Sequence, residues 1–268
     1  MKRMLRNNAK KDKPPLEDEE LLDIGELVLA AESNAFKKQC LALKKERKRK
    51  ENSRYSYSYN FPQQSVTTQV NNIIKSSIRE KNYIKSIATN GTSVVTLHEK
   101  GKSWNGNDKI PPALMTKLLQ AKRKSTYVSL GKHNRYFILF KDGKTQHWDG
   151  PKAMDLLFLV RPVRCVAFGG EKEDIVVVYD DGSWKHLGTL PPDLEEFLME
   201  GGRKKNIVSI TLGSNGEFFV KNKEGSMWWG GLPKKTNETI DKLIHDAGKT
   251  LYLVDFGSSQ GSYFIMYS

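Results

Sequence analysis

The sequence predicts a mainly β fold with helices: a five-unit, β-propeller-like ring of three-stranded blades, each followed by a short helix. Three observations lead to this prediction. A strand-rich segment recurs along the chain with a period of about 40 residues. Within each copy, turn residues separate short apolar runs in the way expected of hairpins. The last copy is cut short, and the segments that it lacks occur near the start of the chain.

Residues 1–54 are predicted to form a basic arm and an amphipathic helix, separate from a repeat domain over residues 55–268. Residues 1–15 are polar and basic and end in two prolines, which is typical of a disordered arm. From residue 16 to residue 54 the apolar residues recur at helical spacing. Acidic residues come first and basic residues last, as the helix macrodipole favours. The apolar stripe of this helix has to be buried, either on the repeat domain or on a partner.

Each unit is marked by an apolar residue three positions before the residue that ends its first strand. That last residue is glycine in four units and Asn90 in the first, and both types tolerate a left-handed backbone. We call the apolar residue the landmark of its unit, and the landmarks of units 1 to 5 are Ile87, Val128, Val166, Ile210 and Val254. A second strand follows, then a tight turn, often Asp-Gly, and a third strand that carries tryptophan. Proline-led helices are predicted over residues 111–123, 151–159, 191–200 and 233–247.

The fifth unit lacks a third strand and a helix after its second strand, Tyr263–Tyr267. Residues 55–80 supply both, because Tyr55–Phe61 alternates aromatic and small polar residues and residues 66–80 follow a helical pattern. Phe61 takes the place that tryptophan has in the other units. We therefore expect both ends of the chain to build the fifth unit, which closes the ring. The alternative is an α+β repeat stack whose termini are adjacent by accident.

The order of strand, glycine, strand, acidic-Gly turn, strand and Trp-Gly is clearest in LGSNGEFFVKNKEGSMWWGG, residues 212–231. It resembles the blade repeats of RCC1-like and tachylectin-2-like β-propellers, and the resemblance covers residues 87–268. Members of these groups bind chromatin, small GTPases or sugars, and the resemblance does not choose among these ligands. The helix after each third strand and the count of five units depart from the RCC1-like pattern, so no family site residue is carried over.

The repeated tryptophans have two interpretations. One aromatic ring at the same place in every blade would provide equivalent stacking sites for sugars or bases. A large aromatic side chain in each unit is also the usual filler between blades. Trp228 and Trp229 are adjacent in one strand and face opposite sides of the sheet. One of the two is therefore expected to be less buried, which makes this pair a binding candidate.

Basic residues gather at the helix-to-strand junction of every unit. In a ring these junctions fall on one edge, where they would form a positive rim that attracts phosphates or acidic proteins. The alternative is that cations at helix C-termini are favourable without any partner. The candidate rim residues are Lys122, Arg123, Lys124, Arg161, Arg164, Arg203, Lys204 and Lys205.

A second basic stretch lies at the end of the predicted N-terminal helix and fits a nuclear-import or nucleic-acid segment. It consists of Lys44, Lys45, Arg47, Lys48, Arg49 and Lys50. The formal net charge of +13 also favours acidic partners. The two cysteines form no CxxC pattern, no secretory leader is recognisable, and no apolar run approaches the ~20 residues that span a bilayer. These features predict an intracellular protein, in the nucleus or cytoplasm, without a membrane partner.

No residue pattern indicates catalysis, a cofactor or a metal ion. The histidines are scattered, and neither a phosphate-binding loop nor a nucleophile motif is present. We therefore expect a non-catalytic binding or scaffold protein that engages an acidic macromolecule, either nucleic acid or acidic protein, through the basic rim and the N-terminal basic segment. The alternatives are a lectin-like propeller that binds glycans through its tryptophans and a subunit of a larger complex that docks a partner helix on residues 16–54.

Overall fold

The structure is a computed structural model of the chain. It describes residues 56–61, 64–79, 84–98, 104–120, 124–148, 157, 161–200, 206–257 and 261–268, and these lie in one compact unit. The predicted arm and helix of residues 1–54 lie outside the described residues, as does the predicted helix of residues 151–159 apart from Leu157. The domain boundary near residue 55 stays a prediction.

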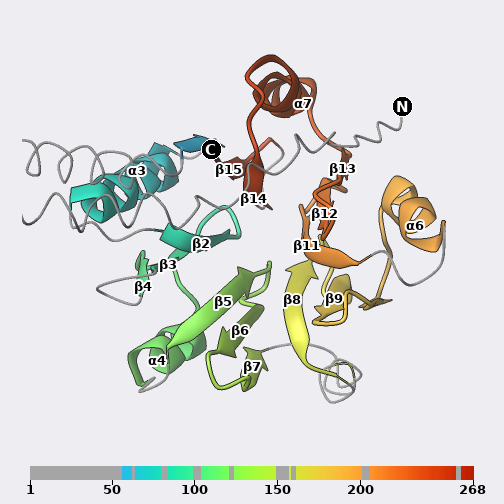
Figure 1. Cartoon of the computed structure of the whole chain (residues 1–268). Coiled ribbons are helices and arrows are strands. Elements are labelled where there is room, and N and C mark those ends of the chain that lie inside the picture. The colour runs from blue at the N-terminus through green and yellow to red at the C-terminus, as the bar shows by residue number, and fades with distance from the viewer. Residues whose placement is uncertain are drawn as a thin grey trace, which may run out of the picture. The chain divides into compact units, whose positions relative to one another are not determined.

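Five antiparallel sheets of three strands each make up the described fold (Figure 1). The first strands of units 1 to 5 are β2 (Ile84–Thr89), β5 (Ser125–Leu130), β8 (Val163–Phe168), β11 (Ile207–Leu212) and β14 (Leu251–Phe256). The second strands are β3 (Val94–His98), β6 (Tyr136–Phe140), β9 (Ile175–Tyr179), β12 (Phe218–Asn222) and β15 (Tyr263–Tyr267). The third strands of units 1 to 4 are β4 (Trp104–Gly106), β7 (Thr145–Trp148), β10 (Trp184–Leu187) and β13 (Met227–Gly230).

The five units share one register. Every landmark residue is the fourth residue of its first strand and is buried. In every unit the pairing of the first and second strands shifts between the first and third residues of the first strand. The second residue is therefore an extra one that stands outside the ladder, which is a β-bulge. The bulged residues are Lys85, Thr126, Arg164, Val208 and Tyr252.

The fifth sheet has the order β1-β15-β14, in which β1 (Ser56–Asn60) comes from the other end of the chain. Ser56 pairs with Tyr267 and Asn60 pairs with Tyr263, so the two strands are antiparallel over their full length. Phe61, at the position that tryptophan has elsewhere, is only 5% exposed. The prediction that both ends of the chain build the fifth unit is confirmed.

The first strands form a ring. β2 contacts β5, β5 contacts β8, β8 contacts β11, β11 contacts β14, and β14 contacts β2. The structure is therefore propeller-like, as the sequence predicts, and is not an open stack of repeats. Because each first strand touches the next, the junctions between units lie where the five sheets meet.

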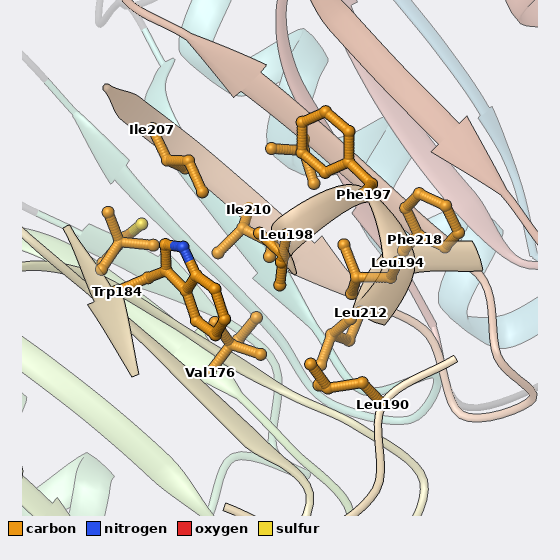
Figure 2. Packing of buried hydrophobic residues seen from close by; sticks show 14 residues of the cluster. Val176, Trp184, Leu190, Leu194, Phe197, Leu198, Ile207, Ile210, Leu212 and Phe218 are labelled. Atoms are coloured by element: carbon orange, nitrogen blue, oxygen red, sulfur yellow. The ribbon is translucent and has the colours of Figure 1, made fainter. Parts of the chain in front are cut away.

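Short helices cover these junctions. The helices are α3 (Gln64–Arg79), α4 (Pro112–Gln120), α6 (Pro192–Met199) and α7 (Lys234–Asp241), which continues into one π-helical turn, η1 (Lys242–Asp246). α6 buries Leu194, Phe197 and Leu198 in a cluster that also contains Val176 of unit 3 and Ile210 of unit 4 (Figure 2). A helix that follows one unit thus fills the space between that unit and the next, which gives burial to its apolar face.

Polar side chains also link neighbouring units through main-chain atoms of the first strands and the loops that follow them. Examples are the hydrogen bonds from Asn90 Nδ2 to the Gly131 carbonyl (3.2 Å), from Tyr127 Oη to the Val166 carbonyl (2.8 Å), from Thr211 Oγ1 to the Val254 carbonyl (2.9 Å), and from the Thr89 amide to Asp255 Oδ2 (2.7 Å). Between units 3 and 4 the loops are packed so closely that a Cβ on Gly170 would lie 2.5 Å from the Ser214 carbonyl oxygen. Every junction of the ring is therefore tied by a specific contact.

Replacing Thr211 with valine should lower the free energy of unfolding by about 1–2 kcal/mol, because the buried Val254 carbonyl loses its cross-unit donor while the shape of the side chain is kept. Denaturant unfolding of the full chain measures the effect. Thr239→Val, which removes an exposed hydroxyl from α7, is the control and should change stability by less than about 0.5 kcal/mol. Equal losses in both variants would contradict a role of Thr211 in joining the units.

Candidate functional site

The segments that lead from a helix into the next first strand lie on the same edge of the sheets as the hairpin turns. This is because the start of each first strand pairs with the end of the second strand, where the hairpin turn begins. The amide of Lys141 donates to the Lys124 carbonyl (2.9 Å), that of Asp180 to Pro162 (3.0 Å), and that of Lys223 to Asn206 (2.9 Å). We call this side the hairpin edge; it comprises the turns 141–144, 180–183 and 223–226, the junction residues 124, 161–162, 206 and 249–250, and the adjoining residues Arg164, Lys221 and Tyr252.

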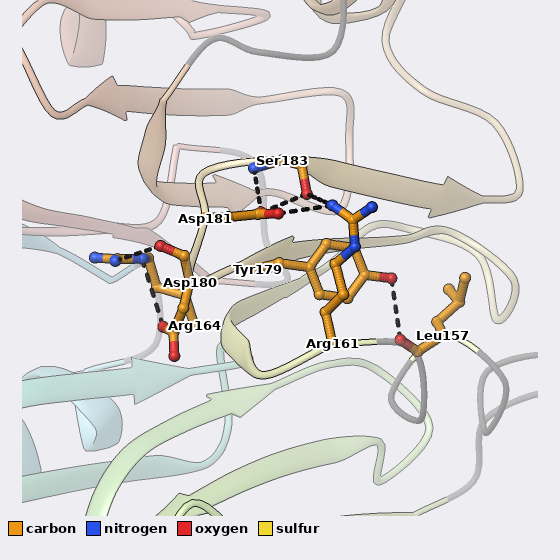
Figure 3. A network of polar contacts seen from close by, with 7 residues as sticks. All are labelled: Leu157, Arg161, Arg164, Tyr179, Asp180, Asp181 and Ser183. Atoms are coloured by element: carbon orange, nitrogen blue, oxygen red, sulfur yellow. Dashed lines mark hydrogen bonds and ion pairs between the residues drawn. The ribbon is translucent and has the colours of Figure 1, made fainter.

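Arg161 is paired with an acidic residue of the hairpin turn in its own unit. Its Nη1 lies 2.6 Å from Asp181 Oδ2 and donates to Ser183 Oγ at 3.0 Å (Figure 3). The pKa of Asp181 is lowered, first by the hydroxyl and amide of Ser183, which donate to it, and then by Arg161. All three side chains take part in one surface network, so the charge of Arg161 is balanced within the unit.

Arg164, the bulged residue of β8, is held by the same turn. Its Nη2 donates to the main-chain carbonyl of Asp180 at 2.9 Å, and its Nε lies 3.8 Å from Asp180 Oδ1 (Figure 3). The turn is anchored beneath by Tyr179, whose hydroxyl donates to the Leu157 carbonyl at 3.0 Å. Acidic turn residues therefore alternate with basic junction residues in unit 3, and the described part of this edge does not support a uniformly positive rim.

The other candidate cations are placed only in part. Lys124 is described, exposed and on the hairpin edge. The remaining rim candidates Lys122, Arg123, Arg203, Lys204 and Lys205 lie outside the described residues, as do Lys44, Lys45, Arg47, Lys48, Arg49 and Lys50. In unit 4 the hairpin acid Glu224 accepts a hydrogen bond from Asn206 Nδ2 at 3.0 Å, so an acidic turn again borders the junction.

Three large apolar side chains of the described residues are exposed. Leu119 in the last turn of α4 is 70% exposed, and Met199 at the end of α6 is 57% exposed. Tyr252, the bulged residue of β14, is 42% exposed. The Tyr252 ring lies 5.5 Å from Nζ of Lys221, which bonds the Leu251 carbonyl at the start of β14, so this aromatic group lies beside the charged turns. The hairpin edge is therefore mixed in character, with cations, carboxylates and apolar groups.

Trp228 and Trp229 face opposite sides of β13, as their adjacency predicts, but both are half-buried. The ring of Trp228 packs 4.4 Å from that of Phe197 in α6. Trp229 packs against the core between units 4 and 5, and its indole N–H donates to Asn237 Oδ1 at 2.9 Å. Trp184 is buried and Trp104 is half-buried against a core cluster. These contacts are those expected of side chains that fill the space between units.

Among the described residues, no group of three or more His, Cys, Asp and Glu side chains could hold a metal ion. Nor does that part of the chain contain a helix of the length and apolarity needed to cross a bilayer. The buried thiol of Cys165 has a pKa raised to about 12 by burial, so it stays protonated at neutral pH.

Comparison with known proteins leaves the chain without a family. No family model matches it, and no curated protein matches it. One solved structure that it matches is described as "YCF48 bound to D1 peptide", with 9% sequence identity and a TM-score of 0.31. The match covers 55% of this chain and 50% of that one, so the chain spans about half the length of its structural relative. The resemblance to RCC1-like and tachylectin-2-like blades stays a prediction.

Proposed function

We propose that this protein is a non-catalytic binding scaffold that docks a protein partner on the hairpin edge. The observation that carries this proposal is the composition of that edge, where Lys124, the Asp180–Asp181 turn and Tyr252 represent its basic, acidic and apolar groups. Protein interfaces combine an apolar centre with a polar, charged rim. Because the chain as a whole is basic, the partner is expected to present acidic side chains together with apolar ones.

Nucleic acid is a less suitable ligand for this edge. Surfaces that bind nucleic acid are much more positive than protein–protein interfaces, because they neutralise closely spaced phosphates. Here Asp180, Asp181 and Glu224 stand among the cations and would repel phosphates. The tryptophan rings, which a glycan would use for stacking, are packed against Phe197 and the core between units 4 and 5.

Reversing two exposed cations of the hairpin edge should weaken the binding of an acidic partner. The variant is Lys124→Glu with Lys249→Glu in the full chain, and the probe is a fluorescent peptide of about 15 residues that combines glutamate with leucine and phenylalanine. We expect its Kd to rise by about fivefold or more, which is about 1 kcal/mol of binding free energy. Fluorescence anisotropy at roughly physiological salt gives the Kd.

The control changes the net charge equally but away from this edge. It is Lys132→Glu with Lys235→Glu, in the loop after β5 and at the start of α7, and it should change the Kd by less than about twofold. Equal weakening by both double variants would show that only net charge matters and would contradict the proposed site. Tighter binding of a DNA duplex than of the peptide, with a steep salt dependence, would favour the nucleic-acid alternative.

A further inference from the structure

One lysine breaks the pattern that the five units share. Lys221 lies in β12 opposite Ser209 of the first strand. The residues at the same register position of the other second strands are all aliphatic: Leu97, Leu139, Val178 and Met266. Four units therefore have an apolar side chain at this position, whereas unit 4 has the charged side chain of a lysine. Departures from a consistent structural pattern are expected where function demands them.

The surroundings of Lys221 do not neutralise its charge. Its Nζ donates to the Leu251 carbonyl of unit 5 at 2.7 Å and lies 5.5 Å from the centre of the Tyr252 ring. Both partners are uncharged, and within the part of the chain that the structure describes Lys221 forms no ion pair. A carbonyl uses one of its three N–H donors, which leaves two for another acceptor. The side chain is half-buried, and this burial lowers the pKa of Lys221, so an added negative charge would be favourable there.

We infer that Lys221 and Tyr252 form an anion site on the hairpin edge that accepts a carboxylate side chain of the protein partner. The source of the carboxylate rests on the proposed function, whereas the site itself follows from the two residues. A carboxylate oxygen bonds the free N–H groups of Lys221 in a charge-assisted hydrogen bond. The Tyr252 ring, which is partly exposed, lies beside it and packs against an apolar neighbour of the acidic residue. Binding raises the pKa of Lys221, because the charged form gains an opposite charge.

Lys221→Met tests the site, because Met266 already occupies the equivalent position of unit 5 and the variant should fold. Its binding of the acidic peptide described above is compared with that of the wild type, and Lys235→Met, an exposed lysine at the start of α7 and away from the hairpin edge, is the matched control. We expect the Kd to rise about tenfold for Lys221→Met and by less than about twofold for Lys235→Met. In the wild type, NMR of the lysine side chains should show the pKa of Lys221 rising when the peptide binds.

The outcomes separate the two proposals. If Lys221→Met binds the peptide as tightly as the wild type while the hairpin-edge double variant binds it weakly, the anion site is wrong and the proposed function stands. If the peptide binds no form of the protein, the proposed function is wrong, and a titration with acetate decides the anion site. A shift of the Lys221 side-chain signal on addition of acetate would then support the site as one for free carboxylates, and no shift would overturn it.

Discussion

Replacing Arg135 with methionine is expected to lower the free energy of unfolding by about 3–5 kcal/mol, because the side chain joins two units from a completely buried position. Arg135 is 0% exposed and precedes the second strand of unit 2. It donates to the carbonyls of Gly169 and Lys172 in unit 3, both at 2.9 Å, and to that of Lys132 at 3.1 Å. Methionine fills much of the volume but leaves these carbonyls without their donors.

Thermal unfolding of the full chain checks this prediction, and the expected loss corresponds to a fall in Tm of roughly 6–20 °C. Lys144→Met is the control, because it removes a charge of the same sign from an exposed turn of the same unit and should leave Tm nearly unchanged. A loss of less than about 1 kcal/mol in Arg135→Met would show that the contact between units 2 and 3 does not depend on the guanidinium.

Stability is expected to fall by about 2–4 kcal/mol as the pH rises from 4 to 8, because of Asp255. This half-buried carboxyl of β14 accepts the Thr89 amide across the junction that closes the ring. Burial raises its pKa to about 7, although the Thr89 and Phe256 amides, which donate to it, act in the opposite direction. The charge of an ionised Asp255 in turn helps to raise the pKa of Tyr127, after the larger effect of burial. In the unfolded chain the carboxyl has its ordinary pKa of about 3.9.

The sign follows from the number of protons bound in each state. Between pH 4 and pH 7 the folded protein keeps a proton on Asp255 that the unfolded chain has lost, so folding takes up a proton and each rise in pH disfavours it. The stabilisation is complete below pH 4 and is lost as the pH rises through 7. Asp255→Asn removes the titration but keeps an oxygen for the Thr89 amide.

Denaturant unfolding of the Asp255→Asn variant and the wild type at several pH values tests this explanation. The variant should match the wild type at pH 4 and be more stable at pH 8, by up to the amount that the wild type loses. Asp181→Asn is the control, because the pKa of that exposed carboxyl is lowered in the folded state, so the variant should keep the pH dependence of the wild type between pH 4 and pH 8. Parallel pH curves for Asp255→Asn and the wild type would rule out Asp255 as the source of the pH dependence.

The architecture could be predicted from the sequence because each unit repeats the same local signals. Landmarks such as Val128 and Ile210 are buried at the same strand position, and β6, β9 and β15 have the bounds that the apolar runs predict. The split fifth unit could be predicted as well, since a missing strand and helix at one end matched an extra strand and helix at the other. These features depend on spacing along the chain, which a sequence displays directly.

The contacts between units could not be predicted in this way. The cross-unit hydrogen bonds are made by Tyr127, Thr211 and Asp255, and each has its partner in the neighbouring unit. The equivalent first-strand positions of other units hold residues such as alanine and serine, so no repeated sequence pattern marks these contacts. The mixed charge of the hairpin edge was missed for a different reason. Arg161 belongs to a junction and Asp181 to a turn about 20 residues later, and only the antiparallel register of a strand pair brings them together.

The bulge that recurs in all five first strands divides their residues into two groups. The paired residues, among them the buried landmarks, hold the ring together, whereas the bulged residues are available for contact with a partner. The bulged residues stand outside the ladder and none is fully buried, yet they are chemically unlike: Lys85, Thr126, Arg164, Val208 and Tyr252. Because these residues stand outside the ladder, we expect substitution at these five places to leave the strand pairing and the buried landmarks in place. The surface that a partner meets can therefore vary at these positions while the architecture stays the same.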